Sequence, residues 1–345
     1  MQYAILGRSG IEVSRLCLGA MMFGSPTDEA EAARIISDAR EAGVNFIDTA
    51  DKYEDGRSEE ITGRAIKADR DRWVLATKVG TSGRDLKYPA LANLSRRYVM
   101  QSVESSLKRL GTDRIDLYYI HRHDPHTPDE EVVRTFGDLI QSGKILHFGL
   151  SNLRAWQITH YAHLCREMGV PQPVAIQPYY NLMNRTPEVE VLPAARHFNM
   201  AVMPYSPLAR GVLSGKYKPG AEPPAESRAG RKDGRMMMAE WRPESLEVAE
   251  RLQAHAAGRG KGIIDYAVAW SLNNGAVTSV LAGPRTFAQW RGYVGALDYA
   301  WDAEDEALAD SLVQPGHPST PGFTDPFYPV RGRFPTIRAA KIKPA

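Results

Sequence analysis

Cysteine is scarce in this 345-residue chain, which has only Cys17 and Cys165. Cys17 lies in an apolar, strand-like run, and Cys165 lies in a segment with helical spacing. Two such positions provide no disulfide framework, so a reducing compartment is the simplest setting. The length is sufficient for a large hydrophobic core, and we expect that core to hold the fold together.

A large net charge is also missing. Lys and Arg number 43 against 41 Asp and Glu, which leaves a formal charge of +2. This composition lacks the excess of basic residues that is typical of proteins bound to nucleic acid or to a membrane surface. We therefore expect neither of these partners.

Long apolar runs do not occur in the chain. No run reaches the roughly 18 residues that indicate a membrane-spanning helix. The opening residues, MQYAILGRSG, do not show the basic start and apolar stretch of a secretory signal. The sequence therefore predicts a soluble protein of the cytoplasm.

Familiar nucleotide and metal motifs are absent as well. There is no GxGxxG, and the Gly-Lys pairs at Gly143 and Gly215 lack the Ser or Thr that completes a phosphate loop. The turn HRHDPH, which begins at His121, has possible metal ligands, but they lie in one short loop without the distributed spacing of a structural zinc site. The patterns alone thus predict no metal and no dinucleotide.

Short apolar runs that end in polar residues alternate with segments of helical spacing. One such segment begins after Asp28 and stops at Gly43, and another runs from Ser95 to Gly111. Eight strands alternating with helices predict a parallel sheet that closes into a (β/α)8 barrel, with an open doubly wound sheet as the alternative. The eight predicted strands lie near residues 16–19, 44–47, 73–76, 115–119, 145–150, 174–176, 201–204 and 277–281.

Three segments fall outside this alternation. Residues 3–14 have the pattern of a β-hairpin, and residues 209–242, rich in Pro, Gly and charge, predict a long loop over the barrel mouth. We divide the chain into a barrel, residues 1–313, and an extended C-terminal tail, residues 314–345, that is either exposed or serves as a lid or an oligomer arm. No other feature indicates a homo-oligomer. The tail has five basic residues and no acidic one after Asp325: Arg331, Arg333, Arg338, Lys341 and Lys343.

Polar side chains follow three successive predicted strands. Asp48 and then Tyr53 follow the second strand, Lys78 ends the third and His121 ends the fourth. Each one alone has an ordinary explanation as a cap, a loop residue, a solvated charge or a structural histidine. Because the carboxyl ends of barrel strands build the active site, their combination predicts a single site.

These four residue types suit the reduction of a carbonyl. A phenol with a pKa of about 10 is a reluctant acid, and a nearby ammonium such as Lys78 makes its proton easier to give up. Asp48 supplies the counter-charge that a buried ammonium requires. A neutral His121 can hydrogen-bond the carbonyl oxygen, so no metal and no covalent intermediate is required.

Several motifs carry a resemblance to a known family. The segments LGRSGIEVSRLCLGAMMFG, FIDTADKYEDGRSEE, VLATKVG, IDLYYIHRHDP, GKILHFGLSN and PYSPLARGVLSGKY resemble the aldo-keto reductase superfamily, and in particular its bacterial and fungal members related to potassium-channel β subunits. The resemblance covers about residues 1–300. It implies a (β/α)8 barrel and an NADP-dependent oxidoreductase that reduces aldehydes or ketones. The family's catalytic tetrad falls on Asp48, Tyr53, Lys78 and His121, with Tyr53 as the proton donor.

The resemblance also implies an NADPH site across the barrel mouth. Tyr205 matches the ring that stacks on the nicotinamide, and Arg285 suits a 2′-phosphate because a guanidinium pairs with it bidentately. Residues 206–211 match the segment that wraps the pyrophosphate. The residues assigned to the cofactor are Gly19, Met21, Asp48, Ser151, Asn152, Gln177, Tyr205, Ser206, Pro207, Leu208, Arg210, Gly211, Gly283, Arg285 and Gln289.

Two positions depart from the family pattern. Tyr293 stands where relatives typically carry Asn in contact with the adenine, and Glu54 stands where Gly is common. We assign Phe23, Tyr88 and His123 to substrate contacts, because they lie in loops at the expected barrel mouth. Bulky or cyclic ketones are one substrate class that a large mouth would admit. The sequence leaves two functions open, a carbonyl reductase and a slowly turning NADP-binding regulatory subunit.

Overall fold

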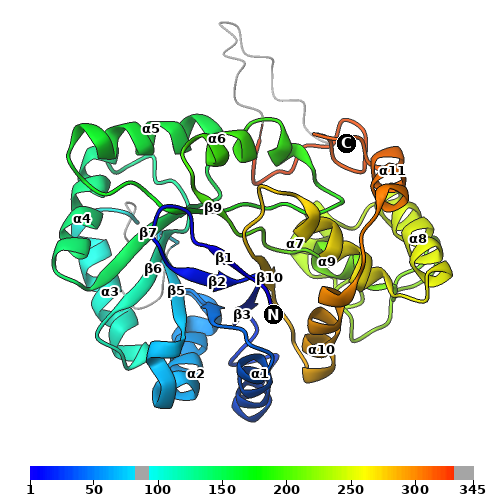
Figure 1. Ribbon diagram of the computed structural model, residues 1–345, viewed down its shortest axis with the longest axis horizontal. Coiled ribbons are helices and arrows are strands. Elements are labelled where there is room, and N and C mark those ends of the chain that lie inside the picture. The colour runs from blue at the N-terminus through cyan, green and yellow to red at the C-terminus, as the bar shows by residue number, and fades with distance from the viewer. Residues whose placement is uncertain (82–92, 330–345) are drawn as a thin grey trace, which may run out of the picture.

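The computed structural model describes residues 1–81 and 93–329, and an eight-stranded parallel sheet forms its centre (Figure 1). The backbone amides of Thr278 and Leu281 donate to the carbonyl oxygens of Val202 and Pro204 at 2.9 and 3.1 Å, which closes the sheet. The predicted (β/α)8 barrel is thereby confirmed, and the open doubly wound sheet is excluded. The strands are β3 (Leu16–Gly19), β4 (Phe46–Asp48), β5 (Val74–Val79), β6 (Ile115–Ile120), β7 (Ile145–Ser151), β8 (Ala175–Gln177), β9 (Ala201–Val202) and β10 (Val280–Ala282).

Helices surround the barrel (Figure 1). The helix α1 follows the predicted pattern at its start, where the Asp28 side chain accepts a hydrogen bond of 2.8 Å from the Glu31 amide. Its predicted apolar face, Ile35, Ile36 and Ala39, is buried. These three side chains belong to the large core cluster that also contains Leu16 and Leu18 of β3. The helices are α1 (Glu29–Glu41), α2 (Arg57–Ile66), α3 (Arg96–Leu110), α4 (Asp129–Gln141), α5 (Ala155–Glu167), α6 (Val191–His197), α8 (Pro243–Gly258), α9 (Ile263–Asn273), α10 (Phe287–Gly295) and α11 (Ala303–Leu312).

The predicted hairpin is present as strands β1 (Tyr3–Ile5) and β2 (Glu12–Ser14), which pair antiparallel. Leu6 and Val13 are fully buried and join the core cluster that fills the inside of the barrel. The turn at Gly7 has a φ of +54°, and a Cβ there would lie 2.2 Å from the Val174 carbonyl oxygen, so only glycine fits. The hairpin thus covers the end of the barrel opposite to the carboxyl ends of the strands.

Two further segments lie at the carboxyl ends. The expected loop over residues 209–242 contains the 3-10 segment η4 (Ala209–Ser214) and the short helix α7 (Gly234–Ala239). Residues 314–329 of the tail lie against the barrel, where the Ser319 amide donates to the Met183 carbonyl oxygen at 3.0 Å. Asp325 forms a two-pronged ion pair with Arg235, with Nη1 2.7 Å from Oδ1. The tail's five basic residues lie outside the described residues.

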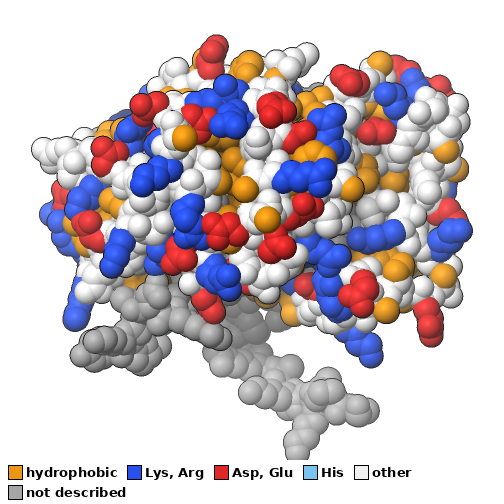
Figure 2. Space-filling view, turned by 90° about the horizontal axis from the view of Figure 1, so that it is seen from below, with side chains coloured by type: hydrophobic (Ala, Val, Ile, Leu, Met, Phe, Trp, Pro, Cys, Tyr) orange, Lys and Arg blue, Asp and Glu red, His pale blue; other side chains and the backbone are white. Residues whose placement is uncertain are grey.

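The surface of the molecule carries both signs of charge. Figure 2 shows acidic and basic side chains interspersed over one face of the molecule. Within the described part of the chain, no helix has the length and apolar character needed to cross a membrane. Cys17 and Cys165 are both buried and unpaired.

Candidate active site

The carboxyl ends of neighbouring strands bring the predicted residues together. Gly19 ends β3 and pairs in register with Asp48 at the end of β4, while Ser151 at the end of β7 pairs with Gln177 at the end of β8. Lys78 lies next to the last residue of β5. His121 directly follows β6.

The turn after β4 is fixed by buried hydroxyl groups. The Thr49 and Ser58 hydroxyl oxygens lie 2.8 Å apart, and Ser58 donates to the Ala20 carbonyl oxygen at 2.7 Å. Tyr53 begins the short 3-10 segment η1 (Tyr53–Gly56) that follows. Glu54 has a φ of +47° there, in the left-handed region that favours glycine. Glu54 therefore places backbone strain beside Tyr53.

Lys78 is completely buried and neutralised by Asp48. Its ammonium donates to Asp48 Oδ1 and, at 2.7 Å, to the Thr49 carbonyl oxygen. The other carboxylate oxygen accepts a hydrogen bond of 2.9 Å from Gln177. Burial lowers the pKa of Lys78, but attraction to Asp48 and Tyr53 outweighs burial and raises the pKa above its ordinary value. The ammonium is therefore charged at neutral pH.

Tyr53 and His121 lie next to this ion pair. The Lys78 Nζ is 4.9 Å from the centroid of the Tyr53 ring, and the Tyr53 and His121 rings meet edge to face at 6.0 Å. Burial raises the pKa of Tyr53, while the charge of Lys78 acts in the opposite direction. Burial and the nearby positive charges hold the pKa of His121 well below its usual range. A protonated phenol and a neutral imidazole therefore lie side by side.

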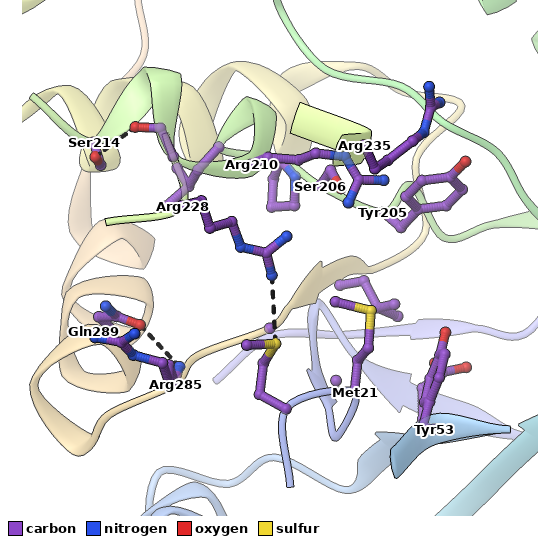
Figure 3. A pocket seen from close by; sticks show the side chains of 18 of the residues that line it. Met21, Tyr53, Tyr205, Ser206, Arg210, Ser214, Arg228, Arg235, Arg285 and Gln289 are labelled. Atoms are coloured by element: carbon purple, nitrogen blue, oxygen red, sulfur yellow. Dashed lines mark hydrogen bonds between the residues drawn. The ribbon is translucent and has the colours of Figure 1, made fainter. Parts of the chain in front are cut away.

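A cavity of about 490 Å³ opens over these residues, and all fifteen residues that the resemblance assigns to the cofactor line it. Figure 3 shows Tyr53 and Tyr205 at one end and Arg228, Arg285 and Gln289 toward the other. The Tyr205 hydroxyl donates to Asn152 Oδ1 at 2.8 Å. The lining is thus elongated, with the rings of Tyr53 and Tyr205 at one end and the guanidinium groups of Arg228 and Arg285 toward the other.

The lining is also strongly basic, with eight Lys and Arg side chains against the carboxylates of Asp48 and Glu226. Arg228 extends from the long segment to the Met22 sulfur at 3.3 Å, and burial and Arg210 lower its pKa (Figure 3). Among the described residues, Arg210 Nε is buried without a hydrogen-bond partner. Because buried polar groups are normally paired, this cavity suits an elongated anion such as a dinucleotide phosphate.

Sequence reasoning missed part of this lining. The charge-rich segment 209–242, expected over the barrel mouth, was the available indication for most of the missed residues. No pattern indicated Phe327, which reaches the cavity from the tail. The missed residues with charged, hydroxyl or aromatic side chains are Lys52, Arg122, Ser214, Lys216, Glu226, Ser227, Arg228, Arg231, Arg235 and Phe327.

Two of the three expected substrate contacts can be located, and both lie outside the cavity lining. Phe23 is completely buried in the core, and His123 lies beside Asp129, with Nδ1 3.8 Å from Oδ1; neither lines the cavity. Tyr88 lies outside the described residues. In the HRHDPH turn, Asp124 accepts hydrogen bonds from the Leu94 amide at 3.0 Å, the His126 amide at 2.9 Å and the Thr127 hydroxyl at 2.8 Å. The carboxylate of Asp124 therefore organises the turn.

Comparison with known proteins gives a consistent result over almost the whole chain. The profile of the aldo/keto reductase family matches residues 15–314. An uncharacterized oxidoreductase of Bacillus subtilis, YrpG, is 36% identical over 329 residues, which are 92% of this chain and 97% of that protein. A probable voltage-gated potassium channel subunit beta of Oryza sativa is 37% identical over 289 residues, 82% and 87% of the two chains. Versiconal hemiacetal acetate reductase of Aspergillus parasiticus is 33% identical over 298 residues, 79% and 86% of the two chains. The chain belongs to the aldo/keto reductase family.

Proposed function

We propose that this protein reduces an aldehyde or ketone to the alcohol with NADPH, in the cytoplasm. The observation that carries the proposal is the buried Lys78–Asp48 ion pair, which lies directly beside Tyr53 and His121 at one end of a basic, elongated cavity. When bound, the nicotinamide supplies the hydride. The residues of the chain would orient the carbonyl and supply the proton.

Tyr53 is the proton donor in this proposal. Its raised pKa keeps the phenol protonated at neutral pH, so that it can donate to the carbonyl oxygen as negative charge develops there. The Lys78 ammonium stabilises the phenolate that remains, and Asp48 holds that ammonium in place. His121, neutral at this pH, donates a hydrogen bond to the same oxygen.

The cofactor residues at the two ends of the cavity are suited to different parts of NADPH. Ser151, Asn152 and Gln177 are suited to the carboxamide of the nicotinamide, because their side chains offer hydrogen-bond donors and acceptors beside Tyr205. At the other end, Arg285 is suited to a 2′-phosphate, which favours NADP over NAD. The bulky or cyclic ketones suggested by the sequence stay a prediction.

The replacement Tyr53→Phe tests the proton donor. Because general acid catalysis contributes about a hundredfold or more, we expect reduction to fall by at least that factor while NADPH binding stays within about twofold. NADPH oxidation at the nicotinamide absorbance measures the first quantity, and fluorescence titration measures the second. Tyr3→Phe, on the hairpin far from the cavity, is the control. Full activity of Tyr53→Phe would mean that the tetrad assignment is wrong.

The replacement Arg285→Ala tests the choice of cofactor. Loss of a charge-assisted contact of about 2 kcal/mol predicts a dissociation constant for NADPH about thirtyfold higher, with that for NADH nearly unchanged. Arg291→Ala is a matched control, since Arg291 is on α10, which begins two residues after Arg285, but it pairs with Asp38 and does not line the cavity. Equal weakening of NADPH and NADH would refute the role in binding the 2′-phosphate.

A regulatory subunit that binds NADP and turns over slowly is the second candidate. Relatives named as potassium channel β subunits support it, including the protein of Oryza sativa and one of Arabidopsis thaliana, 35% identical over 311 residues. The four tetrad positions do not separate the two functions. NADPH oxidation against a broad panel of aldehydes and ketones does, because negligible turnover with tight NADPH binding favours the regulatory subunit.

A further inference from the structure

Two cations line the catalytic end of the cavity. Lys52 directly precedes Tyr53 in the chain, and Arg122 directly follows His121. Both side chains line the cavity and remain exposed to solvent. Tyr53 and His121 are the residues that would hydrogen-bond the carbonyl oxygen. Each of them therefore has a positively charged neighbour in the sequence.

Neither cation has an acidic partner among the residues that the structure describes. Within residues 1–81 and 93–329, Lys52 and Arg122 form no ion pair. Of the carboxylates that line the cavity, Asp48 is bound to Lys78, and Glu226 comes from the long segment that also carries Arg228. The positive charge at the catalytic end is therefore not compensated by these carboxylates.

The acidic neighbour of Lys52 in sequence does not compensate its charge either. Burial and the negative charge of Glu59 raise the pKa of the Asp51 carboxyl to about 8, so this group is mostly neutral at pH 7. Burial, and then the positive charge of Arg122, lower the pKa of Lys52. An anion bound between Lys52 and Arg122 would relieve this repulsion.

An aromatic ring holds Arg122 at the cavity. Its guanidinium lies 4.9 Å from the centroid of the Phe327 ring, which itself lines the cavity. Arg235 lies 4.1 Å from the centroid of the same ring, but its charge is neutralised by Asp325. The ring contact positions Arg122 and leaves its charge available, since a cation above an aromatic face keeps its hydrogen-bond donors.

We propose that the substrate is a carbonyl compound that carries a carboxylate close to the carbonyl group, and that Lys52 and Arg122 bind this carboxylate. This inference rests on the proposed function and names its substrate class. A guanidinium binds a carboxylate bidentately, and the ammonium of Lys52 adds a second charge-assisted contact. With Phe327 as an apolar wall, the catalytic end of the cavity fits an oxo acid better than a neutral aldehyde.

Matched pairs of substrates test the proposal at saturating NADPH. The pairs are 4-oxobutanoate and its methyl ester, and 4-carboxybenzaldehyde and its methyl ester. We expect kcat/KM to be about tenfold or more higher for each acid than for its ester, and added salt to reduce this preference. Equal values for acid and ester would overturn the proposal and leave carbonyl reduction intact.

The variants Lys52→Gln and Arg122→Gln locate the effect. Each is expected to lower kcat/KM for the acids about tenfold and to leave the esters within about twofold. Arg57→Gln is the matched control, because it removes an exposed charge from the start of α2, close to Lys52 in sequence, without changing the cavity lining. Loss of the acid preference in the control, or its retention in both test variants, would refute the assignment to Lys52 and Arg122.

Binding without turnover separates this inference from the proposed function. In the Tyr53→Phe protein with NADP, calorimetry compares 4-(hydroxymethyl)benzoate with the corresponding amide. We expect the carboxylate to bind about tenfold more tightly than the amide, and Arg122→Gln to remove the difference. Equal binding of the two compounds would overturn the proposal even if no reducible substrate has been found.

Discussion

The turn that carries Tyr53 also contains a buried carboxyl group whose protonation affects the stability of the fold. Asp51 is 8% exposed, and among the described residues its Oδ1 has no hydrogen-bond partner. Glu59 lies close enough to repel it, although Glu59 itself is paired with Arg109, with Nε 2.7 Å from Oε2. Burial, and then Glu59, raise the pKa of Asp51 from 3.8 to about 8.

The replacement Asp51→Asn removes this titration and preserves the shape of the side chain. Because the folded pKa is the higher one, the folded protein binds more protons than the unfolded chain between pH 4 and pH 8. Stability is therefore lost as the pH rises through that window. Each pH unit corresponds to about 1.4 kcal/mol, so between pH 5 and pH 8 the ionisation of Asp51 costs about 4 kcal/mol.

Urea unfolding at pH 5, 6, 7 and 8 measures this effect. The free energy of unfolding of Asp51→Asn relative to the unmodified protein should rise with pH by up to about 4 kcal/mol. Asp298→Asn, a replacement of the same kind at an exposed position, is the control and is measured at the same four pH values. A difference between Asp51→Asn and the unmodified protein that stays constant with pH would refute a protonated Asp51.

Two further replacements test the ion pair and the strained turn. Lys78→Met leaves the Asp48 carboxylate buried without its counter-ion, so urea unfolding should show a loss of about 3–5 kcal/mol; the double variant with Asp48→Asn should recover part of this loss, and an unchanged stability of Lys78→Met would contradict the buried pair. Glu54→Gly relieves a φ of +47° and should raise the free energy of unfolding by about 1 kcal/mol, measured as a higher melting temperature. A lower melting temperature would show that the Glu54 side chain stabilises the turn by more than its backbone strain costs.

The eight barrel strands could be predicted from sequence because each is a short apolar run that ends in polar residues. Their limits could not, since they depend on which backbone groups find a partner in the neighbouring strand. Val44 is buried but precedes the ladder of β4, which begins at Phe46. Val277 belongs to a turn, where its amide donates to the Asn274 carbonyl oxygen at 2.9 Å, and β10 begins at Val280.

The segments outside the barrel pattern were harder to predict. Helix α7 has only six residues, too few to show a helical period, and its start depends on one contact from Asp233 Oδ1 to the Met236 amide at 2.8 Å. The position of residues 314–329 depends on contacts distant in sequence, such as Arg235 with Asp325. Local pattern contains no information about such pairs. The division of the chain at residue 314 stays a prediction.

Most ion pairs of the charged residues in the site could not be predicted from sequence either. The sequence singled out Lys78 and its counter-charge Asp48, but it did not distinguish Lys52, Arg122 and Arg235, each of which carries one positive charge. The fold makes them unequal, because Asp48 neutralises Lys78 and Asp325 neutralises Arg235, while Lys52 and Arg122 have no acidic partner within the described residues. The neutralised Lys78 lies beside the proton donor, and the neutralised Arg235 binds the tail segment. An unpaired cation on the wall of a cavity instead attracts an anionic ligand. The pairing of each charge, rather than its presence, therefore decides which cations stabilise the site and which select the substrate.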